Sequence, residues 1–452
     1  MILEQLRRSG QEAAVVGFGK SGVAASLLLR SHDLPVYASE LGVTPATEEA
    51  ARTLREAGAE VELGGHTLER IARAGVMVVA PGVPPDAPPY RAAASAGVPI
   101  VAEVDLGYTN LPATRFIALT GTNGKTTTTS LIAHVLRTTG FSEALAAGNI
   151  GLPLCDVARQ ATAPRWVALE LSSFQLHDCP HIRPQIAVLL NLAPNHLDRY
   201  ATLADYYADK ALLFRNADER SVTVSNADDP AVGEMASTVP GRHLFFSVTK
   251  QADGWFDRPN DRLMLGTEPL LRRRDLPILG DHNVANALAA ALAAREAGAT
   301  MESIADGLRT FTAIPHRVEP VRELNGVLWI NDSKSTNITS TEVAIAALDR
   351  PFVLLLGGRH KGEPYTRLAP RLAGRCRAVV AYGESGDLVE QDLGDAVTVV
   401  RATTFEDVIE RARSLAQPGD AALLSPACSS YDMFKNYEER GARFRALVEA
   451  MA

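Results

Sequence analysis

The segment that most constrains the fold lies at residues 120–127, which read T-G-T-N-G-K-T-T. The apolar run 115–119 precedes it, and a helix-favouring stretch at 130–138 follows it. Gly121 and Gly124 let the backbone curl so that its N–H groups face phosphate oxygens, and the N-terminus of a following helix favours anions. This order of strand, glycine-rich loop and helix predicts an α/β sheet with a triphosphate site at a strand end.

The polar residues of this loop suit such a site. Lys125 can reach the β- and γ-phosphates of ATP, and Thr126 can bind Mg²⁺. The strict phosphate-binding pattern has four residues between its glycines, whereas two separate Gly121 from Gly124, and Leu119 stands where the strict pattern has glycine. The alternative is a glycine-rich turn whose lysine is merely solvated.

Strand-like and helix-like segments alternate along the 452 residues, a length that suggests about three domains. Short apolar runs predict strands at residues 13–17, 35–38 and 76–80, then at 115–119, 166–169, 186–191 and 221–225, and finally at 326–330, 352–356, 378–382, 397–400 and 421–424, with a helix at 283–297. We expect three α/β domains: an N-terminal Rossmann-like domain at 1–108, a central ATP-binding domain with the phosphate-binding loop at 109–313, and a C-terminal Rossmann-like doubly wound sheet at 314–452.

The composition argues against several other classes of protein. The formal net charge of −8 does not suit a protein that mainly binds nucleic-acid phosphates. Cys155, Cys179, Cys376 and Cys428 are far apart, which indicates neither a zinc site nor a disulfide framework and suits a reducing compartment. Residues 1–10 do not resemble a signal peptide, and no apolar run approaches the roughly 18 residues of a membrane span. We therefore expect a cytoplasmic monomer with no nucleic-acid partner and no membrane insertion.

Further motifs follow one another along almost the whole chain. They are G-N-I-G-L at 148–152, L-E-L-S-S-F-Q-L at 169–176, H-L-D-R-Y at 196–200, P-H-R at 315–317, N-D-S-K-S-T-N at 331–337 and S-P-A-C-S-S-Y-D-M-F-K-N-Y-E-E-R-G at 425–441. Together with the loop at 120–127, these motifs resemble the Mur ligase family, which also includes folylpolyglutamate synthases. The segments L-E-L-S-S-F-Q-L and S-P-A-C-S-S are most similar to the branch that joins D-glutamate to UDP-N-acetylmuramoyl-L-alanine.

The resemblance implies an ATP-dependent ligase of peptidoglycan precursor synthesis, a process that serves cell-wall biogenesis, cell shape and cell division. Such a ligase activates a carboxylate as an acyl phosphate, which an incoming amine then attacks. The implied substrates are UDP-N-acetylmuramoyl-L-alanine and D-glutamate, and the implied cofactors are ATP and Mg²⁺, with two Mg²⁺ ions expected. The chemistry requires metal ions to hold the triphosphate and cations to stabilise the transferring phosphoryl group.

The resemblance also implies the metal-binding and catalytic residues. Glu170 ends a predicted strand, and Mg²⁺ prefers hard oxygen ligands such as its carboxylate. Lys210 would be N-carboxylated by CO₂ and would bind a second Mg²⁺ as a carbamate. The expected metal ligands are Thr126, Glu170, His196 and Lys210, and the expected catalytic residues are Lys125, Glu170, His196, Lys210 and Lys334. Without the resemblance, a buried or capping carboxylate is the alternative for Glu170, a structural histidine is the more common interpretation of His196, and a solvated helix residue is the usual interpretation of Lys210.

The remaining assignments concern ATP and D-glutamate. D-Glutamate has two carboxylates and needs cationic and hydroxyl donors, which Thr336, Lys361, Ser430 and Tyr437 would supply. Arg317 would offer a planar charge to the transferring phosphoryl group, although an interdomain salt bridge would also account for it. The expected ATP contacts are Gly121, Thr122, Asn123, Gly124, Lys125, Thr126, Thr127, Asn286, His316, Arg317 and Asp332.

A second glycine motif, G-F-G-K-S-G at 17–22, follows the first predicted strand. It satisfies the G-x-G-x-x-G dinucleotide fingerprint, and Glu40 lies near the acidic position about 20 residues further on, which favours an NAD(P)-dependent oxidoreductase. The triphosphate loop at 120–127 argues against this alternative, because a dehydrogenase does not need one. The resemblance implies instead that the motif cradles the diphosphate of the UDP-sugar. The expected UDP-sugar contacts are Gly17, Phe18, Gly19, Lys20, Ser21, Gly22, Ser39, Gly82 and Asn149.

Two segments differ from the family pattern. Asn195 stands where the family usually has an acidic residue before His196, and it can orient the ring but supplies no charge. A-S-E at 38–40 replaces an acidic–Thr–Arg run expected near the uracil. The alternatives are a sister ligase for another amino acid, a folate polyglutamylator, and a nonenzymatic nucleotide-sensing or scaffold protein. The amino acid that turnover requires distinguishes them.

Overall fold

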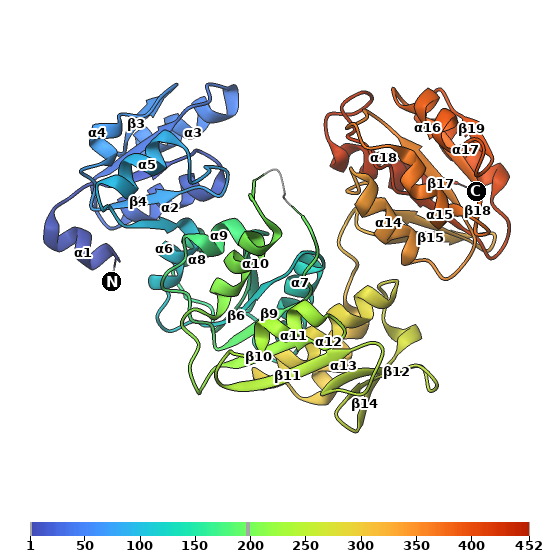
Figure 1. Ribbon diagram of the computed structural model, residues 1–452, viewed down its shortest axis with the longest axis horizontal. Coiled ribbons are helices and arrows are strands. Elements are labelled where there is room, and N and C mark those ends of the chain that lie inside the picture. Colours follow the sequence, from blue (N-terminus) through green and yellow to red (C-terminus); the bar gives the residue numbers. More distant parts are fainter. Residues whose placement is uncertain (1, 196–198, 452) are drawn as a thin grey trace. The chain divides into compact units, whose positions relative to one another are not determined.

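The computed structural model describes residues 2–195 and 199–451. Its strands form three sheets, each from one stretch of the chain, so that the first is blue, the second cyan to yellow and the third orange to red (Figure 1). The chain forms two compact units, Met1–Arg273 with Ala285–Arg309 and Arg274–Val284 with Thr310–Ala452. The predicted three-domain α/β fold is confirmed, whereas the boundaries after residues 108 and 313 stay predictions.

The first sheet is parallel throughout, with the strand order β3-β2-β1-β4-β5. Its strands are β1 (Ala13–Val16), β2 (Val36–Glu40), β3 (Glu60–Leu63), β4 (Val76–Val79) and β5 (Ile100–Ala102). Its helices are α1 (Ile2–Ser9), α2 (Lys20–Ser31), α3 (Pro45–Glu56), α4 (Leu68–Ile71), α5 (Pro88–Ser95) and α6 (Glu103–Thr109). The strand order reverses between β1 and β4, where ligands of doubly wound sheets bind beyond the carboxyl ends of the strands.

Alternate residues of β1 pack on opposite faces of this sheet, as expected for a strand buried on both sides. Ala13 and Val15 share a hydrophobic core with residues of α1, α2, α3 and α6, whereas Ala14 and Val16 pack with residues of α4 and α5. The first face also receives Cys155 of α8, a helix that belongs to the second sheet.

The second sheet has nine strands in the order β14-β13-β12-β11-β10-β9-β6-β8-β7. It is parallel from β7 to β12 and continues as an antiparallel ribbon. The strands are β6 (Arg115–Thr120), β7 (Leu145–Gly148), β8 (Trp166–Glu170), β9 (Ile186–Leu189), β10 (Val222–Asn226), β11 (Arg242–Ser247), β12 (Gly254–Asp257), β13 (Arg262–Leu265) and β14 (Glu268–Arg272). The helices are α7 (Lys125–Thr138), α8 (Leu154–Ala158), α9 (Ser173–His177), α10 (Leu203–Ala211), α11 (Pro230–Ala236), α12 (Asp281–Glu296) and α13 (Met301–Thr310).

A buried polar contact joins the first two sheets within their unit. The backbone N–H of Cys155 donates to Oε1 of Glu103 at 2.6 Å, while Oε2 of Glu103 has no hydrogen-bond partner in the described part of the chain. Burial raises the pKa of Glu103 to about 7. Near this contact, His181 lies 2.6 Å from the buried carboxylate of Asp105. The joint is therefore built from α6 and α8 and contains carboxylates removed from water.

The third sheet has the order β15-β16-β20-β17-β18-β19 and is antiparallel only between β15 and β16. Residues of α14, α15 and α16 share one hydrophobic core with it, and residues of α17 and α18 share another. The strands are β15 (Glu319–Leu324), β16 (Val327–Asn331), β17 (Phe352–Gly357), β18 (Cys376–Tyr382), β19 (Val399–Arg401) and β20 (Ala421–Leu424). The helices are α14 (Ile338–Ala346), α15 (Ala369–Leu372), α16 (Gly386–Leu393), α17 (Phe405–Leu415) and α18 (Tyr437–Glu449).

Every strand predicted from the sequence is present, with ends that differ by at most two residues. The strands that the prediction missed are β3, β5, β7 and β11 to β15. In β12 and β13, buried residues alternate with partly exposed ones, so neither forms the continuous apolar run that marked the central strands. Within residues 2–195 and 199–451, no helix is long and apolar enough to cross a membrane.

Candidate active site

The loop after β6 has the conformation that its glycines predict. Gly121 and Gly124 both adopt positive φ angles, of +157° and +81°. A Cβ atom on Gly124 would lie 2.4 Å from Oδ1 of Asn286, so the structure brings this helix residue, predicted to contact ATP, directly against the loop. The loop is braced on the other side by Asn191, whose Oδ1 accepts a hydrogen bond from the N–H of Asn123 at 2.8 Å.

Two lysines converge on one carbonyl of this loop. The Nζ atoms of Lys125 and Lys210 each donate to the carbonyl oxygen of Gly121 at 2.9 Å. Lys210 is buried and lies 4.6 Å from the ring centroid of Tyr206. Burial, and then the neighbouring charge of Lys125, lower the pKa of Lys210 to about 7. A substantial fraction of this amine is therefore neutral near pH 7, and a neutral amine is nucleophilic.

Glu170 ends β8 at the same edge of the sheet, because Leu119 of β6 and Glu170 are paired in the parallel ladder. Its side chain is buried, and Oε1 accepts a hydrogen bond from Nδ2 of Asn149 at 2.8 Å. Its Oε2 atom is buried without a hydrogen-bond partner among the described residues. Glu170 thus ends the strand next to β6 and bonds to Asn149, a predicted UDP-sugar contact.

These residues can supply part of a Mg²⁺ site. The described residues contain no group of three or more His, Cys, Asp and Glu side chains placed to hold a metal. Mg²⁺ is, however, commonly held by one or two carboxylates together with waters and substrate phosphates. The unpartnered oxygen of Glu170 and the hydroxyl of Thr126 fit that mode of binding. His196, the other predicted ligand, lies outside the described residues.

The loop after β1 is held by an acidic side chain. Oε2 of Glu40 accepts a hydrogen bond from the N–H of Phe18 at 2.8 Å, and Oε1 accepts one from the N–H of Gly42 at 2.8 Å. Beside it, Oγ of Ser39 lies 2.9 Å from Nδ1 of His66, which the sequence analysis did not single out. A Cβ atom on Gly22 would lie 1.8 Å from the carbonyl oxygen of Gly17, so the turn requires glycine at position 22. Glu40 therefore braces the loop after β1 through Oε2, while its Oε1 bonds to the loop after β2.

Gly82 lies in the loop after β4, next to the loop after β1. A Cβ atom on Gly17 would lie 2.7 Å from Cβ of Ala80 and 3.6 Å from a methyl group of Val83. Arg199 donates to the carbonyl oxygens of Pro81 and Val83 at 2.9 and 3.2 Å. Arg199 was not among the predicted site residues, although it stands inside the H-L-D-R-Y motif.

In the second compact unit, the predicted D-glutamate residues lie on neighbouring loops. Nζ of Lys361 donates to Oγ1 of Thr336 at 3.2 Å, and Nζ of Lys334 lies 5.2 Å from the ring centroid of Tyr437. Ser430, the fourth of these predicted residues, is buried. The structure thus pairs Lys361 with Thr336, and Lys334 with Tyr437.

A buried arginine, which the sequence analysis also missed, connects these loops. Nε and Nη2 of Arg440 donate to Oγ and the carbonyl oxygen of Ser333 at 2.9 and 2.7 Å. Nη1 donates to the carbonyl oxygen of Cys428 at 3.2 Å. Arg440 is fully buried, so these bonds hold the loop after β16 to the loop after β20.

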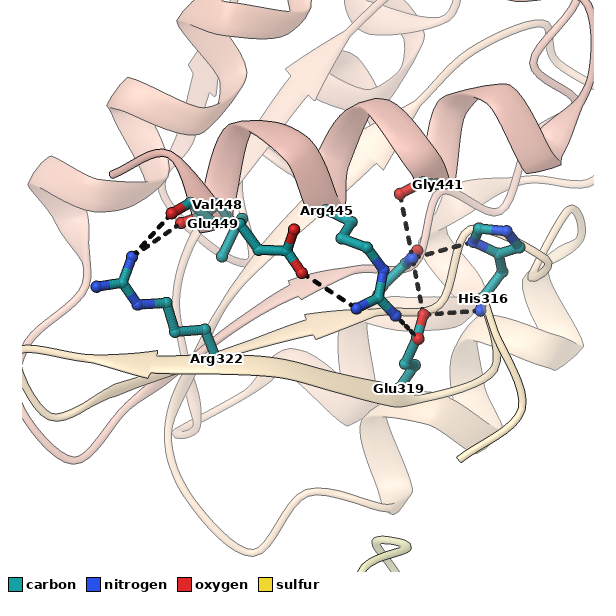
Figure 2. Close-up of polar contacts among 8 residues, drawn as sticks. His316, Glu319, Arg322, Gly441, Arg445, Val448 and Glu449 are labelled. Carbon is teal, nitrogen blue, oxygen red and sulfur yellow. Dashed lines mark hydrogen bonds and ion pairs between the residues drawn. The ribbon is translucent and has the colours of Figure 1, made fainter. Parts of the chain in front are cut away.

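The predicted nucleotide residue His316 is fixed by a polar cluster at the start of β15 (Figure 2). Its N–H donates to Oε2 of Glu319 at 3.0 Å, and its Nδ1 lies 3.0 Å from Nδ2 of Asn331, which also donates to Glu319 at 3.0 Å. Arg445 of α18 forms an ion pair with Glu319. A Cβ atom on Gly441 would lie 2.1 Å from Nδ1 of His316, so the glycine makes room for the ring.

Asp332 lies next to this cluster and is buried. Its carboxylate accepts hydrogen bonds from the N–H of Val318 at 3.1 Å and from Oγ of Ser425 at 2.7 Å. Burial raises its pKa to about 6. Val318, which bonds to Asp332, directly follows His316 and Arg317 in the chain. The predicted nucleotide residues of this unit therefore lie together at one edge of the third sheet.

Known proteins resemble this chain along its whole length. The UDP-N-acetylmuramoylalanine–D-glutamate ligase of Salinibacter ruber is 42% identical over 468 residues and covers 100% of both chains. The enzyme of the same name from Acidobacterium capsulatum is 40% identical over 447 residues, with 98% of this chain and 96% of its own covered. The chain belongs to the Mur ligase family.

Domain models of the Mur ligase family match three consecutive segments. They describe the Mur ligase MurD-like N-terminal domain at residues 11–102, the Mur ligase middle domain at 119–294 and the Mur ligase glutamate ligase domain at 316–428. The resemblance stated from the sequence motifs is therefore confirmed.

Solved Mur ligase structures share the fold. UDP-N-acetylmuramate-alanine ligase from Thermotoga maritima superposes with a TM-score of 0.58 at 20% identity, covering 97% of this chain and 99% of that one. A pseudomurein peptide ligase type C from Methanothermus fervidus has a TM-score of 0.58 at 18% identity, again with 97% and 99% covered. At such identities these structures establish the Mur ligase fold, and the roles of individual residues stay predictions.

Proposed function

We propose that this Mur ligase is an ATP-dependent amide ligase that joins D-glutamate to UDP-N-acetylmuramoyl-L-alanine in peptidoglycan precursor synthesis. Relatives about 40% identical over nearly their full length carry the name of that activity. Among the residues, the observation that carries the proposal is the convergence of Lys125 and Lys210 on the carbonyl of Gly121, after β6, while the buried carboxylate of Glu170 ends the neighbouring strand β8. Phosphoryl transfer from ATP requires a cation, here Lys125, and metal-binding groups at one edge of the sheet.

The first step is activation of a carboxylate. The backbone N–H groups between Gly121 and Gly124 would cradle the phosphates, and Lys125 would turn from its carbonyl partners towards the β- and γ-phosphates. The terminal carboxylate of the nucleotide-sugar substrate attacks the γ-phosphorus. The bond between the γ-phosphorus and the oxygen that bridges it to the β-phosphate breaks, so that ADP departs and the substrate carries an acyl phosphate. Bound Mg²⁺, for which we propose two sites, would neutralise charge on the phosphates, with Thr126, Glu170 and His196 among the ligands.

The second step forms the amide. The neutral amine of D-glutamate attacks the acyl carbon, the bond between that carbon and the phosphate oxygen breaks so that inorganic phosphate leaves, and the nitrogen releases one proton to solvent. We assign D-glutamate to Lys361, Thr336, Ser430 and Tyr437, whose cationic and hydroxyl groups match its two carboxylates. Lys334, beside Tyr437, would balance charge close to the phosphate.

The nucleotide contacts follow the same logic. We assign ATP to the loop at 120–127, including Thr122, Asn123 and Thr127, together with Asn286, His316, Arg317 and Asp332. We assign the UDP diphosphate to the loop from Gly17 to Gly22, with Phe18, Gly19, Lys20 and Ser21, and place Ser39, Gly82 and Asn149 at its border. We also propose that the protein is a monomer and works in the cytoplasm.

Lys210 is proposed to carry a carbamate. Its amine would attack CO₂, forming an N–C bond and releasing one proton, which places a carboxylate where Mg²⁺ can bind. Burial of Lys210 and its pKa of about 7 support the reaction, because only the neutral amine reacts. Native mass spectrometry should detect the added mass of one CO₂ on this protein, and Lys210→Ala should lose both that mass and activity. An active Lys210→Ala variant would exclude the carbamate from the mechanism.

The test of the function is phosphate release from ATP and Mg²⁺ with UDP-N-acetylmuramoyl-L-alanine. D-Glutamate is compared with L-glutamate, L-alanine and L-lysine, and the amide product is identified by mass. Release that requires both the nucleotide sugar and D-glutamate is the expected result. Release with another amino acid would assign the chain to a sister ligase. No release with any of them, together with tight NAD binding, would favour the oxidoreductase alternative.

A further inference from the structure

The loop between β4 and α5 has few donors of its own. Its sequence from residue 81 is P-G-V-P-P, and the three prolines carry no N–H group. The hydrogen bond from the N–H of Val83 to the carbonyl of Ala80, at 3.0 Å, is one link inside this loop. The carbonyl oxygens of Pro81 and Val83 instead accept from the two terminal nitrogens of Arg199, at 2.9 and 3.2 Å. One guanidinium therefore spans both carbonyls that flank Gly82.

This loop forms one wall of the glycine turn after β1. Ala80 and Val83 are the side chains that a Cβ atom on Gly17 would meet, at 2.7 and 3.6 Å. The N–H of Ala80 also donates to the carbonyl of Val16 at 3.0 Å. A shift of the Pro81–Val83 segment would therefore change the space available beside the Gly17 turn.

Arg199 is itself seated on an aromatic platform. Its guanidinium carbon lies 3.9 Å from the ring centroid of Phe174, and Phe174 stacks on Tyr200 with ring centroids 5.6 Å apart at an interplanar angle of 14°. The hydroxyl of Tyr200 donates to Oδ2 of Asp209 at 2.8 Å. Stacking on an aromatic face suits the flat guanidinium, whereas a lysine ammonium would lose both the stacking and the two-pronged contact.

The platform belongs to the elements that carry the triphosphate-site residues. Phe174 lies in α9, which begins three residues after Glu170, and Asp209 precedes Lys210 in α10. One continuous set of contacts thus runs from the Gly17 turn through the Pro81–Val83 segment, Arg199 and Phe174 to α9 and α10.

We infer that Arg199 is a positioning residue for the nucleotide-sugar site: it holds the Pro81–Val83 segment against the Gly17 turn from a platform fixed to α9 and α10. The inference rests on the proposed function for the identity of the nucleotide. Arg199 acts through the backbone of its neighbours, so its loss should weaken binding of the uridine nucleotide and leave the chemistry of phosphoryl transfer in place.

The experiment measures UDP binding to the full chain by calorimetry for the wild type, Arg199→Ala and Arg199→Lys. Loss of two charge-assisted hydrogen bonds should weaken UDP binding by roughly 10-fold or more in Arg199→Ala, and Arg199→Lys should fall between that variant and the wild type. The affinity for a non-hydrolysable ATP analogue should stay unchanged. In steady-state assays, KM for the nucleotide sugar should rise more than kcat falls. Arg220→Ala, which removes an exposed arginine of the same unit, is the matched control and should behave as wild type.

Three results would overturn the inference: wild-type UDP affinity in Arg199→Ala, an equal loss of affinity for the ATP analogue, or a fall in kcat without a rise in KM. If Arg199→Ala does not fold, Arg199→Lys and Phe174→Leu test the inference instead, because each keeps part of the contact set. Both variants should weaken binding of UDP but not of the ATP analogue. Because UDP binding is measured without ligation, its outcome is separate from the proposed function. A wild type that binds UDP but does not ligate would contradict the function and leave Arg199 to be judged on UDP binding.

Discussion

The first compact unit contains two glycine loops that begin alike and end differently. Each follows a buried parallel strand, β1 or β6, and each leads into a helix, α2 or α7. In the first loop, the N–H of Phe18 is occupied by the carboxylate of Glu40. In the second, the carbonyl of Gly121 accepts hydrogen bonds from the amines of Lys125 and Lys210. One loop is thus braced by a negative charge and the other by two amines.

Backbone geometry and charge therefore determine two different properties of these loops. The strand, loop and helix determine where a phosphate can meet backbone N–H groups. The side chains that reach the loop determine how much negative charge it can accept. A carboxylate beside the first loop disfavours a third phosphate, whereas Lys125 in the second loop favours a triphosphate from which a phosphoryl group is transferred.

The largest expected effect on turnover comes from replacing the lysine that begins the helix after a glycine loop, and the two loops should respond differently. Lys125→Ala should lower kcat by roughly 10²- to 10³-fold or more, because it removes a cation that stabilises the transferring phosphoryl group. Lys20 occupies the matching helix start in the first loop and is exposed, so Lys20→Ala should change KM for the nucleotide sugar only a few-fold, by about the worth of one exposed charge contact. Steady-state kinetics with each substrate varied in turn measure both effects. Equal losses of kcat in the two variants would contradict the separation of roles.

A smaller effect is expected from adding one methyl group to the first loop. Gly22→Ala places a Cβ atom 1.8 Å from the carbonyl of Gly17, and relieving such overpacking costs about 1–3 kcal/mol. If the turn opens to relieve it, UDP affinity should fall by about 10- to 100-fold, with affinity for an ATP analogue unchanged. Gly233→Ala is the control, since Gly233 lies within α11, outside the proposed sites, and a Cβ atom there meets nothing within 4 Å. UDP calorimetry on both variants measures the difference, and a similar fall in both would mean that the loop geometry does not govern binding.

The sequence predicted the two loops because each is a local pattern. Glycines, a preceding apolar run and a following helix all lie within about 25 consecutive residues, and the three-sheet architecture follows from the same local alternation. Glu170 and Lys210 could be named only through the resemblance to the Mur ligases. In isolation, a strand-end carboxylate and a helix lysine have ordinary structural explanations.

Contacts between distant residues could not be predicted in this way. Arg199 bonds to Pro81, 118 residues away, and Arg440 bonds to Ser333, 107 residues away. An arginine gives no sign in its own neighbourhood of which carbonyl it will reach, because that depends on how the sheets pack. The ribbon from β12 to β14 was missed for another reason: its strands are short and half-exposed, so they lack the continuous apolar run of the central strands.

The smallest effect on turnover is expected at the joint that connects the sheets of the two loops. Burial raises the pKa of Glu103 from 4.5 to about 7. The folded chain therefore holds this proton more tightly than the unfolded chain, so the stabilisation is complete below pH 4.5 and is lost as pH rises through about 7. The loss is on the order of 3 kcal/mol of unfolding free energy. Glu103→Gln keeps an acceptor for Cys155 but cannot ionise, so urea unfolding at pH 5 and pH 8 should show a flatter dependence than the wild type or the exposed control Glu69→Gln. Unchanged pH dependence in Glu103→Gln would mean that Glu103 does not titrate as a buried group, whereas a flatter dependence with normal kcat would separate the joint from the chemistry of either loop.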